Sequence, residues 1–309
     1  MRNTQERRFI LILHQTHFQK HMIGITLAIL SAAASGFSVV LVGKNSKKTT
    51  PLNISLMISF VGLAILWPLA FILTDFTAVS FIGIAFFAAG GLLTPGLVRL
   101  LYYSGLKNLG NSVNSSIFSV YPLYSSLLAV FLLSEILTLQ NWIGVLSVVL
   151  GVILVEITSR ETNGTSKSVI RSMFFPVIGG LTLGISSIIR KYALNLYNEP
   201  VLGIAVAYTF SFLPYALVLM VHKPTRKELS LKSDFRFFWI AGVGQALSWI
   251  FSFYALSLEK VSVITPLLSI EPLFVVLFAY IYLRELERVP IKLVASILLT
   301  VFGVILVTT

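Results

Sequence analysis

Cysteine is absent from the chain, and charged residues are scarce in it. Without Cys, the protein can form no disulfide, use no thiolate in catalysis and bind no zinc through sulfur. Only 11% of the 309 residues are charged and 56% are hydrophobic, whereas soluble domains carry about 25% charged residues. A soluble protein of this composition would lack the polar groups to cover its surface, so the sequence predicts an all-α integral membrane protein.

Motifs for enzyme chemistry are also missing. The sequence contains no phosphate-binding glycine loop, no nucleophile elbow and no pair of metal ligands at helical spacing. Its four His residues lie outside the apolar segments, and no carboxylate pattern accompanies them. We therefore expect no enzyme activity, no cofactor and no bound metal.

The net charge of +11 is compatible with nucleic-acid binding. However, the basic residues stand singly or in small groups at the ends of apolar segments, where contact with lipid head groups explains them better. We expect membrane lipid as a partner, and no nucleic acid.

Long apolar segments make up most of the chain. A helix that crosses a membrane needs roughly 20 mostly apolar residues. We predict ten such helices, at residues 22–43, 53–74, 79–104, 112–133, 140–157, 171–191, 200–221, 236–257, 262–283 and 290–307. The polar stretch 158–170 is predicted to be a linker between two helical units, 22–157 and 171–308. Residues 1–21 form a polar, basic N-terminal extension, and Met22 is an alternative candidate for the first residue.

One long segment occurs twice. Residues 104–135 and 254–285 align without a gap at an offset of 150, and ten of the 32 positions are identical. The identical positions include two pairs expected to be structural, Pro122 with Pro272 and Glu135 with Glu285. The pentapeptide Gly-Val-Ile-Leu-Val at 151–155 also recurs at 303–307. The chain is therefore predicted to consist of two copies of one structural unit.

Each predicted unit contains five helices. Because five is odd, the second unit enters the membrane from the opposite face, and the two units are inverted relative to each other. Inverted repeats are typical of secondary transporters, which bind substrate near the membrane midplane between the repeats. Gly36 and Gly184 occupy matching positions late in the first helix of each unit, and we expect them to allow close approach of a neighbouring backbone.

Glu271 is the most informative single residue, because it lies near the centre of a predicted helix, directly before Pro272. A charged side chain at mid-bilayer costs roughly 2.5–3.5 kcal/mol on insertion scales, so it must face protein or water. One interpretation is a cavity carboxylate that binds a substrate amine or carries a proton. The other is a buried, protonated residue bonded to a neighbouring helix. Pro272 also predicts a local irregularity in the helix. Tyr121 is the repeat partner of Glu271.

Arg99 follows the break at Thr94-Pro95-Gly96 and falls about one turn from the predicted end of its helix. It could attract a substrate carboxylate or phosphate. The simpler interpretation, which we favour, is a side chain that extends to the membrane interface. A cavity with both Glu271 and Arg99 facing inward would suit a zwitterion such as an amino acid.

Three helices carry polar residues at helical spacing, which places them on one face. For most of the Ser residues we expect polar contacts between helices. Large polar side chains need partners and are better candidates for a binding site. The candidates from these stripes are Ser35, Asn114, Tyr121, Gln245, Ser248 and Trp249.

Several charged residues are expected to be structural. Glu135 and Glu285 each stand just before a predicted helix, where an acidic side chain can cap that helix. Glu156, Arg190 and Lys191 are interpreted as charges at helix ends.

The twin segments end in Ser134-Glu135 and Arg284-Glu285, each with a Pro thirteen residues before the Glu, and each is followed by a helix that closes in Gly-Val-Ile-Leu-Val. Over residues 22–308 this pattern resembles the EamA-like branch of the drug/metabolite transporter superfamily. The Gly that usually precedes the repeated Glu is replaced in both copies. The resemblance implies ten helices in two inverted repeats, with a central cavity lined by helices 1, 3, 4, 6, 8 and 9. It also implies export or exchange of amino acids and related small metabolites.

We therefore expect a secondary transporter of small polar metabolites that exposes a central cavity alternately to the two sides of the membrane. An exchanger of nucleotide sugars or sugar phosphates is one alternative, and a membrane sensor or assembly protein without transport is another. We expect a monomer or homodimer in the cell membrane, with both termini on one side. The resemblance implies cytoplasmic termini, whereas the loops on the opposite side carry more Arg and Lys, which indicates the reverse orientation.

Overall fold

The computed structural model describes residues 2–45, 49–109, 114, 117–118, 120–158, 173–221, 231–283 and 291–308. These residues form helices joined by short connections, and no strand occurs among them. The elements are α1 (Arg2–Asn45), α2 (Pro51–Leu73), η2 (Phe76–Ala78), α3 (Phe81–Gly91), η3 (Leu92–Leu97), α4 (Val98–Leu109), α6 (Tyr121–Leu133), α7 (Leu139–Thr158), α9 (Phe174–Leu196), α10 (Pro200–Val221), α12 (Leu231–Leu258), α13 (Val261–Leu268), α14 (Glu271–Leu283) and α15 (Ile291–Thr308).

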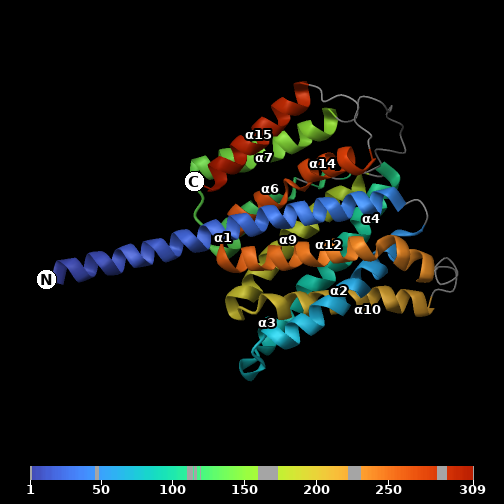
Figure 1. The fold of residues 1–309 in the computed structure, drawn as a ribbon, viewed down its shortest axis with the longest axis horizontal. Helices are drawn as coiled ribbons and strands as arrows, with labels where there is room; N and C mark the ends of the chain where they lie inside the picture. The colour runs from blue at the N-terminus through green and yellow to red at the C-terminus, as the bar shows by residue number, and fades with distance from the viewer. Residues whose placement is uncertain are drawn as a thin grey trace.

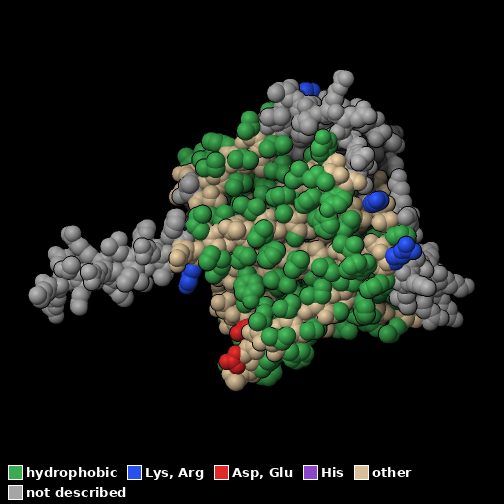
Figure 2. Space-filling model, in the orientation of Figure 1, with side chains coloured by type: hydrophobic (Ala, Val, Ile, Leu, Met, Phe, Trp, Pro, Cys, Tyr) green, Lys and Arg blue, Asp and Glu red, His purple; other side chains and the backbone are tan. Residues whose placement is uncertain are grey.

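Seven described stretches are long and apolar enough to cross a membrane, which supports a multi-pass integral membrane protein. They are Gln19–Asn45, Pro51–Leu73, Phe81–Leu109, Phe174–Leu196, Pro200–Val221, Asp234–Leu258 and Val261–Tyr282. Shorter apolar helices lie at Tyr121–Leu133, Leu139–Leu154 and Ala295–Thr308. Figure 2 shows a broad face covered by hydrophobic side chains, with the visible charged side chains near its edges, as expected for a surface that contacts lipid.

The helices form one bundle, with α7 and α15 side by side at one end and α2, α3 and α10 at the other (Figure 1). In the middle, α1 packs along α12. The hydroxyls of Ser31 and Ser38 donate hydrogen bonds to the carbonyls of Ser248 and Ala241, each over 2.8 Å. The polar contacts between helices that the sequence predicted for this stripe are thus confirmed for Ser31 and Ser38.

Glycine permits the close contact between α7 and α15. A Cβ atom on Gly151 would lie 2.7 Å from the amide nitrogen of Thr300. A Cβ atom on Gly303 would lie 2.6 Å from the amide nitrogen of Val148. Gly151 and Gly303 are repeat partners, and so are Val148 and Thr300, because both pairs are 152 residues apart. Each contact is therefore the copy of the other with the two repeats exchanged.

A second pair of contacts is also repeated with the two repeats exchanged. In each, the first helix of one repeat packs against a helix of the other repeat. Gly36 of α1 packs against α14, where its Cβ would lie 3.1 Å from the carbonyl oxygen of Glu271. Gly184 of α9 packs against α6, where its Cβ would lie 3.5 Å from the carbonyl oxygen of Tyr121. The close approach predicted for Gly36 and Gly184 is confirmed, and the backbone that each one meets belongs to repeat partners.

Two of the membrane-spanning stretches are interrupted near their centres. The stretch Phe81–Leu109 contains the π-helical segment η3, in which Thr94 has extended backbone angles (φ −143°, ψ 118°). The Tyr215 hydroxyl donates hydrogen bonds to the carbonyls of Pro95 and Gly96, which satisfies backbone groups at this break. The second stretch is interrupted between α13 and α14, so the irregularity predicted before Pro272 is confirmed.

Glu135 joins the end of one repeat's helix to the start of a helix in the other repeat. Its carboxylate accepts hydrogen bonds from the amides of Val261 (2.8 Å) and Ser262 (3.0 Å) and from the Ser262 hydroxyl (2.5 Å), at the N-terminus of α13. The prediction that Glu135 caps the helix that follows it is therefore wrong. At the start of α7 that role falls to Thr138 and Asn141, whose side chains accept from each other's amides. The repeat partner Glu285 and the linker 158–170 lie outside the described residues.

Two predicted helix boundaries were too early. The third predicted helix, 79–104, continues to Leu109, and the sixth, 171–191, continues to Leu196. Arg99 and Arg190 consequently lie ten and six residues before the C-terminal ends of α4 and α9, instead of near those ends.

The glycine contact between α7 and α15 can be tested by adding one methyl group. We expect Gly303→Ala to destabilise the protein by about 1–3 kcal/mol, because the methyl group would meet backbone atoms that cannot move aside. The thermal unfolding midpoint of the purified protein in detergent measures the effect.

Gly90→Ala is the matched control, because its added Cβ would meet only the side chains of Arg190 and Ile189, at ordinary distances of 3.5 and 3.6 Å. If both variants unfolded at the same temperature as the native protein, the close contact between α7 and α15 would not be a determinant of stability.

Candidate functional site

A cavity of about 130 Å³ lies at the centre of the bundle, at the interruptions in the two broken helices. Its walls come from α1, from η3 and α4, from α6, from α9, from α12 and from the α13–α14 junction. These elements agree with the six helices that the family resemblance implied. Its polar and charged lining residues are Ser31, Ser35, Thr94, Arg99, Tyr102, Tyr103, Tyr121, Arg190, Gln245, Ser248, Trp249, Ser252, Ser269 and Glu271.

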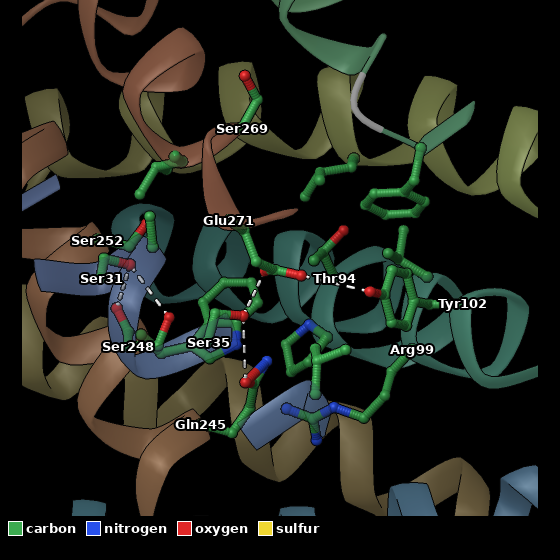
Figure 3. Close-up of a pocket in the computed structure, with 18 of the residues that line it drawn as sticks. Ser31, Ser35, Thr94, Arg99, Tyr102, Gln245, Ser248, Ser252, Ser269 and Glu271 are labelled. Atoms are coloured by element: carbon green, nitrogen blue, oxygen red, sulfur yellow. Dashed lines mark hydrogen bonds between the residues drawn. The ribbon is translucent and has the colours of Figure 1, made fainter. Parts of the chain in front are cut away.

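Glu271 is the first residue of α14, directly after the interruption, and its side chain lines the cavity. The Ser35 hydroxyl donates a hydrogen bond to one carboxyl oxygen over 2.5 Å, and the Tyr102 hydroxyl donates to the other over 3.3 Å. Figure 3 shows these bonds, together with the contact of Ser35 with Gln245. The carboxyl group is therefore both bonded to neighbouring helices and accessible from the cavity, which combines features of the two interpretations made from the sequence.

Arg99 does not extend to the membrane interface, so the interpretation favoured from the sequence is wrong. Its side chain is only 5% exposed and lines the cavity. The guanidinium donates hydrogen bonds to the Ser59 hydroxyl (2.7 Å) and the Tyr208 hydroxyl (3.0 Å), and its central carbon lies 4.9 Å from the centre of the Tyr208 ring. Because α4 continues for ten residues after Arg99, the side chain cannot reach the helix end.

Arg190 also lines the cavity, and its interpretation as a charge at a helix end is wrong. It is 2% exposed, and its guanidinium carbon lies 4.9 Å from the centre of the Trp249 ring and 5.7 Å from that of Phe253. The prediction failed because the predicted helix ended at residue 191, whereas α9 continues to Leu196. The apolar residues of 192–196 are the signal that would have placed Arg190 one turn deeper.

Lys191, which follows it, does contact a helix end. Its amino group donates to the carbonyls of Leu256 (2.7 Å) and Glu259 (2.9 Å), at the C-terminus of α12. A cation at this position satisfies carbonyl groups that have no partner within their own helix.

Seven of the eight candidate binding residues predicted from the sequence line this one cavity. Besides Glu271 and Arg99, they are Ser35, Tyr121, Gln245, Ser248 and Trp249. The Tyr121 hydroxyl donates to the Thr265 carbonyl over 3.0 Å, so it also supports the last turns of α13. Tyr102, Tyr103 and Thr94 also line the cavity. They were not predicted as binding residues, because they carry no charge and occur in otherwise apolar runs.

Asn114 is the exception among the eight candidates, because it is not among the residues that line the cavity. Its amide group donates a hydrogen bond to the Tyr102 carbonyl over 2.9 Å. It packs against Gly105, which leaves no room for a Cβ atom beside it. Asn114 therefore supports α4, the helix that carries Arg99 and Tyr102.

No group of three or more metal-ligating side chains occurs among the described residues. His21 instead forms an ion-pair contact with Glu259 over 3.0 Å, between a ring nitrogen and a carboxylate oxygen. Its second ring nitrogen lies 2.9 Å from the Thr308 carbonyl. These contacts join α1, α12 and α15 at the end of the bundle where the C-terminus lies.

Comparison with known proteins supplies the family. The model of the EamA-like transporter family matches residues 22–157 and 170–309, one match for each repeat. The chain belongs to the EamA-like transporter family. Members of this family are transporters.

Two proteins similar to this EamA-like chain share less than a quarter of their residues with it over the matched lengths. A WAT1-related chloroplastic protein of Arabidopsis thaliana is 23% identical over 187 residues, which are 59% of this chain and 45% of that protein. The match thus spans less than half the length of that relative. A protein of known crystal structure shares the fold, with a TM-score of 0.71, 16% identity and coverage of 94% of this chain and 98% of the other.

The absence of native Cys allows a direct test of whether the cavity contains water. Ser252 lines the cavity, whereas Ser38 is packed between α1 and α12 and is 1% exposed. In detergent, we expect Ser252→Cys to react readily with a small charged methanethiosulfonate, because the reagent requires a hydrated thiolate.

Ser38→Cys is the matched control, and we expect it to react at least about tenfold more slowly, because local opening must precede its reaction. Mass spectrometry of the intact protein follows the labelling. Equal rates for the two variants would show that the cavity is no more accessible to water than the interface between α1 and α12.

Proposed function

We propose that this EamA-like chain is a secondary transporter of small polar metabolites such as amino acids. The observation that supports this proposal best is the central cavity, which is lined by residues of both repeats. Arg99, Arg190 and Glu271 line it beside the interruptions in the two broken helices. Charged residues inside a membrane-spanning bundle are rare because their burial is costly, and they commonly mark substrate or ion pathways.

The contacts between repeats support an inverted arrangement of ten membrane-spanning helices. Along the pair α7–α15, Gly144 meets Gly303 and Gly151 meets Ser296, so the two helices run in opposite directions. Their contacts are copies of each other with the repeats exchanged. A two-fold axis perpendicular to the helices produces such a pattern, and this axis relates the halves of inverted-repeat transporters.

This symmetry suggests how substrate is moved. Two halves with similar contacts on each side of a central cavity can exchange an arrangement open to one face for the two-fold-related arrangement open to the other. We propose that substrate binds between the halves and crosses the membrane as one half rocks against the other. We further propose that the protein works as an exporter or exchanger in the cell membrane, with both termini on the same side.

The size of the cavity favours small substrates. Its volume of about 130 Å³ corresponds to roughly ten water-sized spaces, at 10–15 Å³ for each. This size fits an amino acid better than a nucleotide sugar.

Transport by purified protein in sealed vesicles tests the proposal. A panel of labelled amino acids, sugar phosphates and nucleotide sugars should include a compound that the vesicles accumulate or exchange. Glu271→Gln should slow this transport by at least about tenfold, the effect of losing roughly 1.4 kcal/mol of interaction.

Glu199→Gln is the matched control, because Glu199 lies in the connection between α9 and α10, outside the cavity. Its transport rate should equal that of the native protein. Compounds that bind but never cross the vesicle membrane would contradict transport and indicate a sensor. Full transport by Glu271→Gln would remove Glu271 from the mechanism.

A further inference from the structure

The charges that line the cavity are unequal in number. Arg99 and Arg190 are cations, and Glu271 is the one acidic residue among the described residues of the lining. Arg remains protonated in proteins, so both positive charges persist. An empty cavity therefore has an excess of positive charge even when Glu271 is ionised.

The Arg190 guanidinium has more N–H donors than it uses in hydrogen bonds to the described residues. One terminal nitrogen donates to the Ser187 hydroxyl over 2.9 Å, and Nε donates weakly to the Ser186 carbonyl over 3.4 Å. A guanidinium has five N–H groups, and within the described part of the chain the others have no acceptor. No carboxylate pairs with Arg190 there either. Its charge is met only by the faces of Trp249 and Phe253.

Arg99 is in a similar position. Its hydrogen-bond partners, Ser59 and Tyr208, are both uncharged hydroxyls. Within the described residues, Arg99 forms no ion pair with Glu271, whose hydrogen bonds come from Ser35 and Tyr102. All three charged groups of the cavity are thus held by neutral neighbours and are not neutralised by one another.

An aromatic pair connects the two cations. The rings of Tyr208 and Trp249 lie 6.3 Å apart in an edge-to-face arrangement. Arg99 lies over the first ring and Arg190 over the second. The two guanidinium groups therefore lie against members of one aromatic pair, and both Arg residues line the cavity.

We infer that the preferred substrate is a small amino acid with a second acidic group. Its two acidic groups bind Arg99 and Arg190, and its ammonium group binds Glu271. The inference rests on the proposed function, because it assigns the substrate class of the same cavity. A carboxylate or phosphate suits the planar guanidinium, which can donate two parallel hydrogen bonds to it. Three charges on such a ligand match the three charged groups of the site.

Binding to the purified full-length protein in detergent tests this inference without requiring transport. Calorimetric titration at pH 7 compares L-glutamate with L-glutamine and L-aspartate with L-asparagine. Within each pair the size is nearly the same, and one side chain is a carboxylate while the other is an amide. We expect the acid to bind at least about tenfold more tightly than its amide, because only the acid forms a charge-assisted pair with the second Arg.

Two further probes separate the groups of the ligand. Succinate has two carboxylates and no amino group, so it should bind more weakly than L-aspartate. L-lysine should bind more weakly than any other member of the panel, because its second cation would face an Arg. If an amide bound as tightly as its acid, or if no member of the panel bound, the inference would be overturned.

Variants assign the preference to the Arg residues. Arg190→Gln should bring the affinities of acid and amide to within about twofold of each other, whereas Arg190→Lys should retain part of the preference because it keeps the charge. Arg236→Gln is the control, because Arg236 is exposed on α12 and does not line the cavity. An acid preference that survives Arg190→Gln unchanged would contradict the role of Arg190. If this variant does not fold, the comparisons made with the native protein still decide the inference.

The results also distinguish this inference from the proposed function. If acidic amino acids bind selectively but do not cross sealed vesicles, the transport proposal fails and the site assignment stands. If vesicles transport neutral amino acids as fast as acidic ones, the protein is a transporter and the inferred substrate class is wrong.

Discussion

Charged groups within a membrane need protein or water around them, and this constraint governs the arrangement of the bundle. Arg99, Arg190 and Glu271 lie on three different elements, yet all of them face one central cavity. Each is stabilised by hydroxyl groups or aromatic faces, so none contacts lipid. The remaining surface that Figure 2 shows is free to be hydrophobic. The cavity is therefore the place where the bundle brings these three side chains together.

Repetition builds the walls of this cavity. Gly36 lets α1 approach the backbone at Glu271, and Gly184 lets α9 approach the backbone at Tyr121. The same contact, made twice, brings the first helix of each repeat against a helix of the other repeat whose second residue is Pro. The two equivalent positions carry different side chains, the carboxylate of Glu271 in one repeat and the phenol of Tyr121 in the other. The repeated contacts therefore surround a site whose two sides differ chemically. Glu135 adds a bond between the repeats at the start of α13.

Most of the fold could be predicted from the sequence, because the length of the apolar segments and the internal repeat do not depend on where each helix boundary is placed. Seven of the eight candidate residues line the cavity, and five of them are large polar or charged side chains, which need partners within an apolar segment. Arg190 was missed because a helix boundary set five residues early changed a central residue into a terminal one. The partner of Glu135 lies 126 residues away, so local capping rules could not identify it. Asn114 shows that a buried polar residue can serve a neighbouring helix instead of the cavity.

Chemical labelling from each side of the membrane measures whether the central cavity opens alternately to both faces. A single Cys in place of Gln245 would be labelled with a charged, membrane-impermeant reagent, in sealed vesicles that hold the protein in one orientation. We expect the Cys to react with reagent added on either side, while the reagent itself does not leak across. Reaction from one side only, both with and without substrate, would contradict alternating access. The protein would then be a receptor or sensor whose cavity opens to a single face of the membrane.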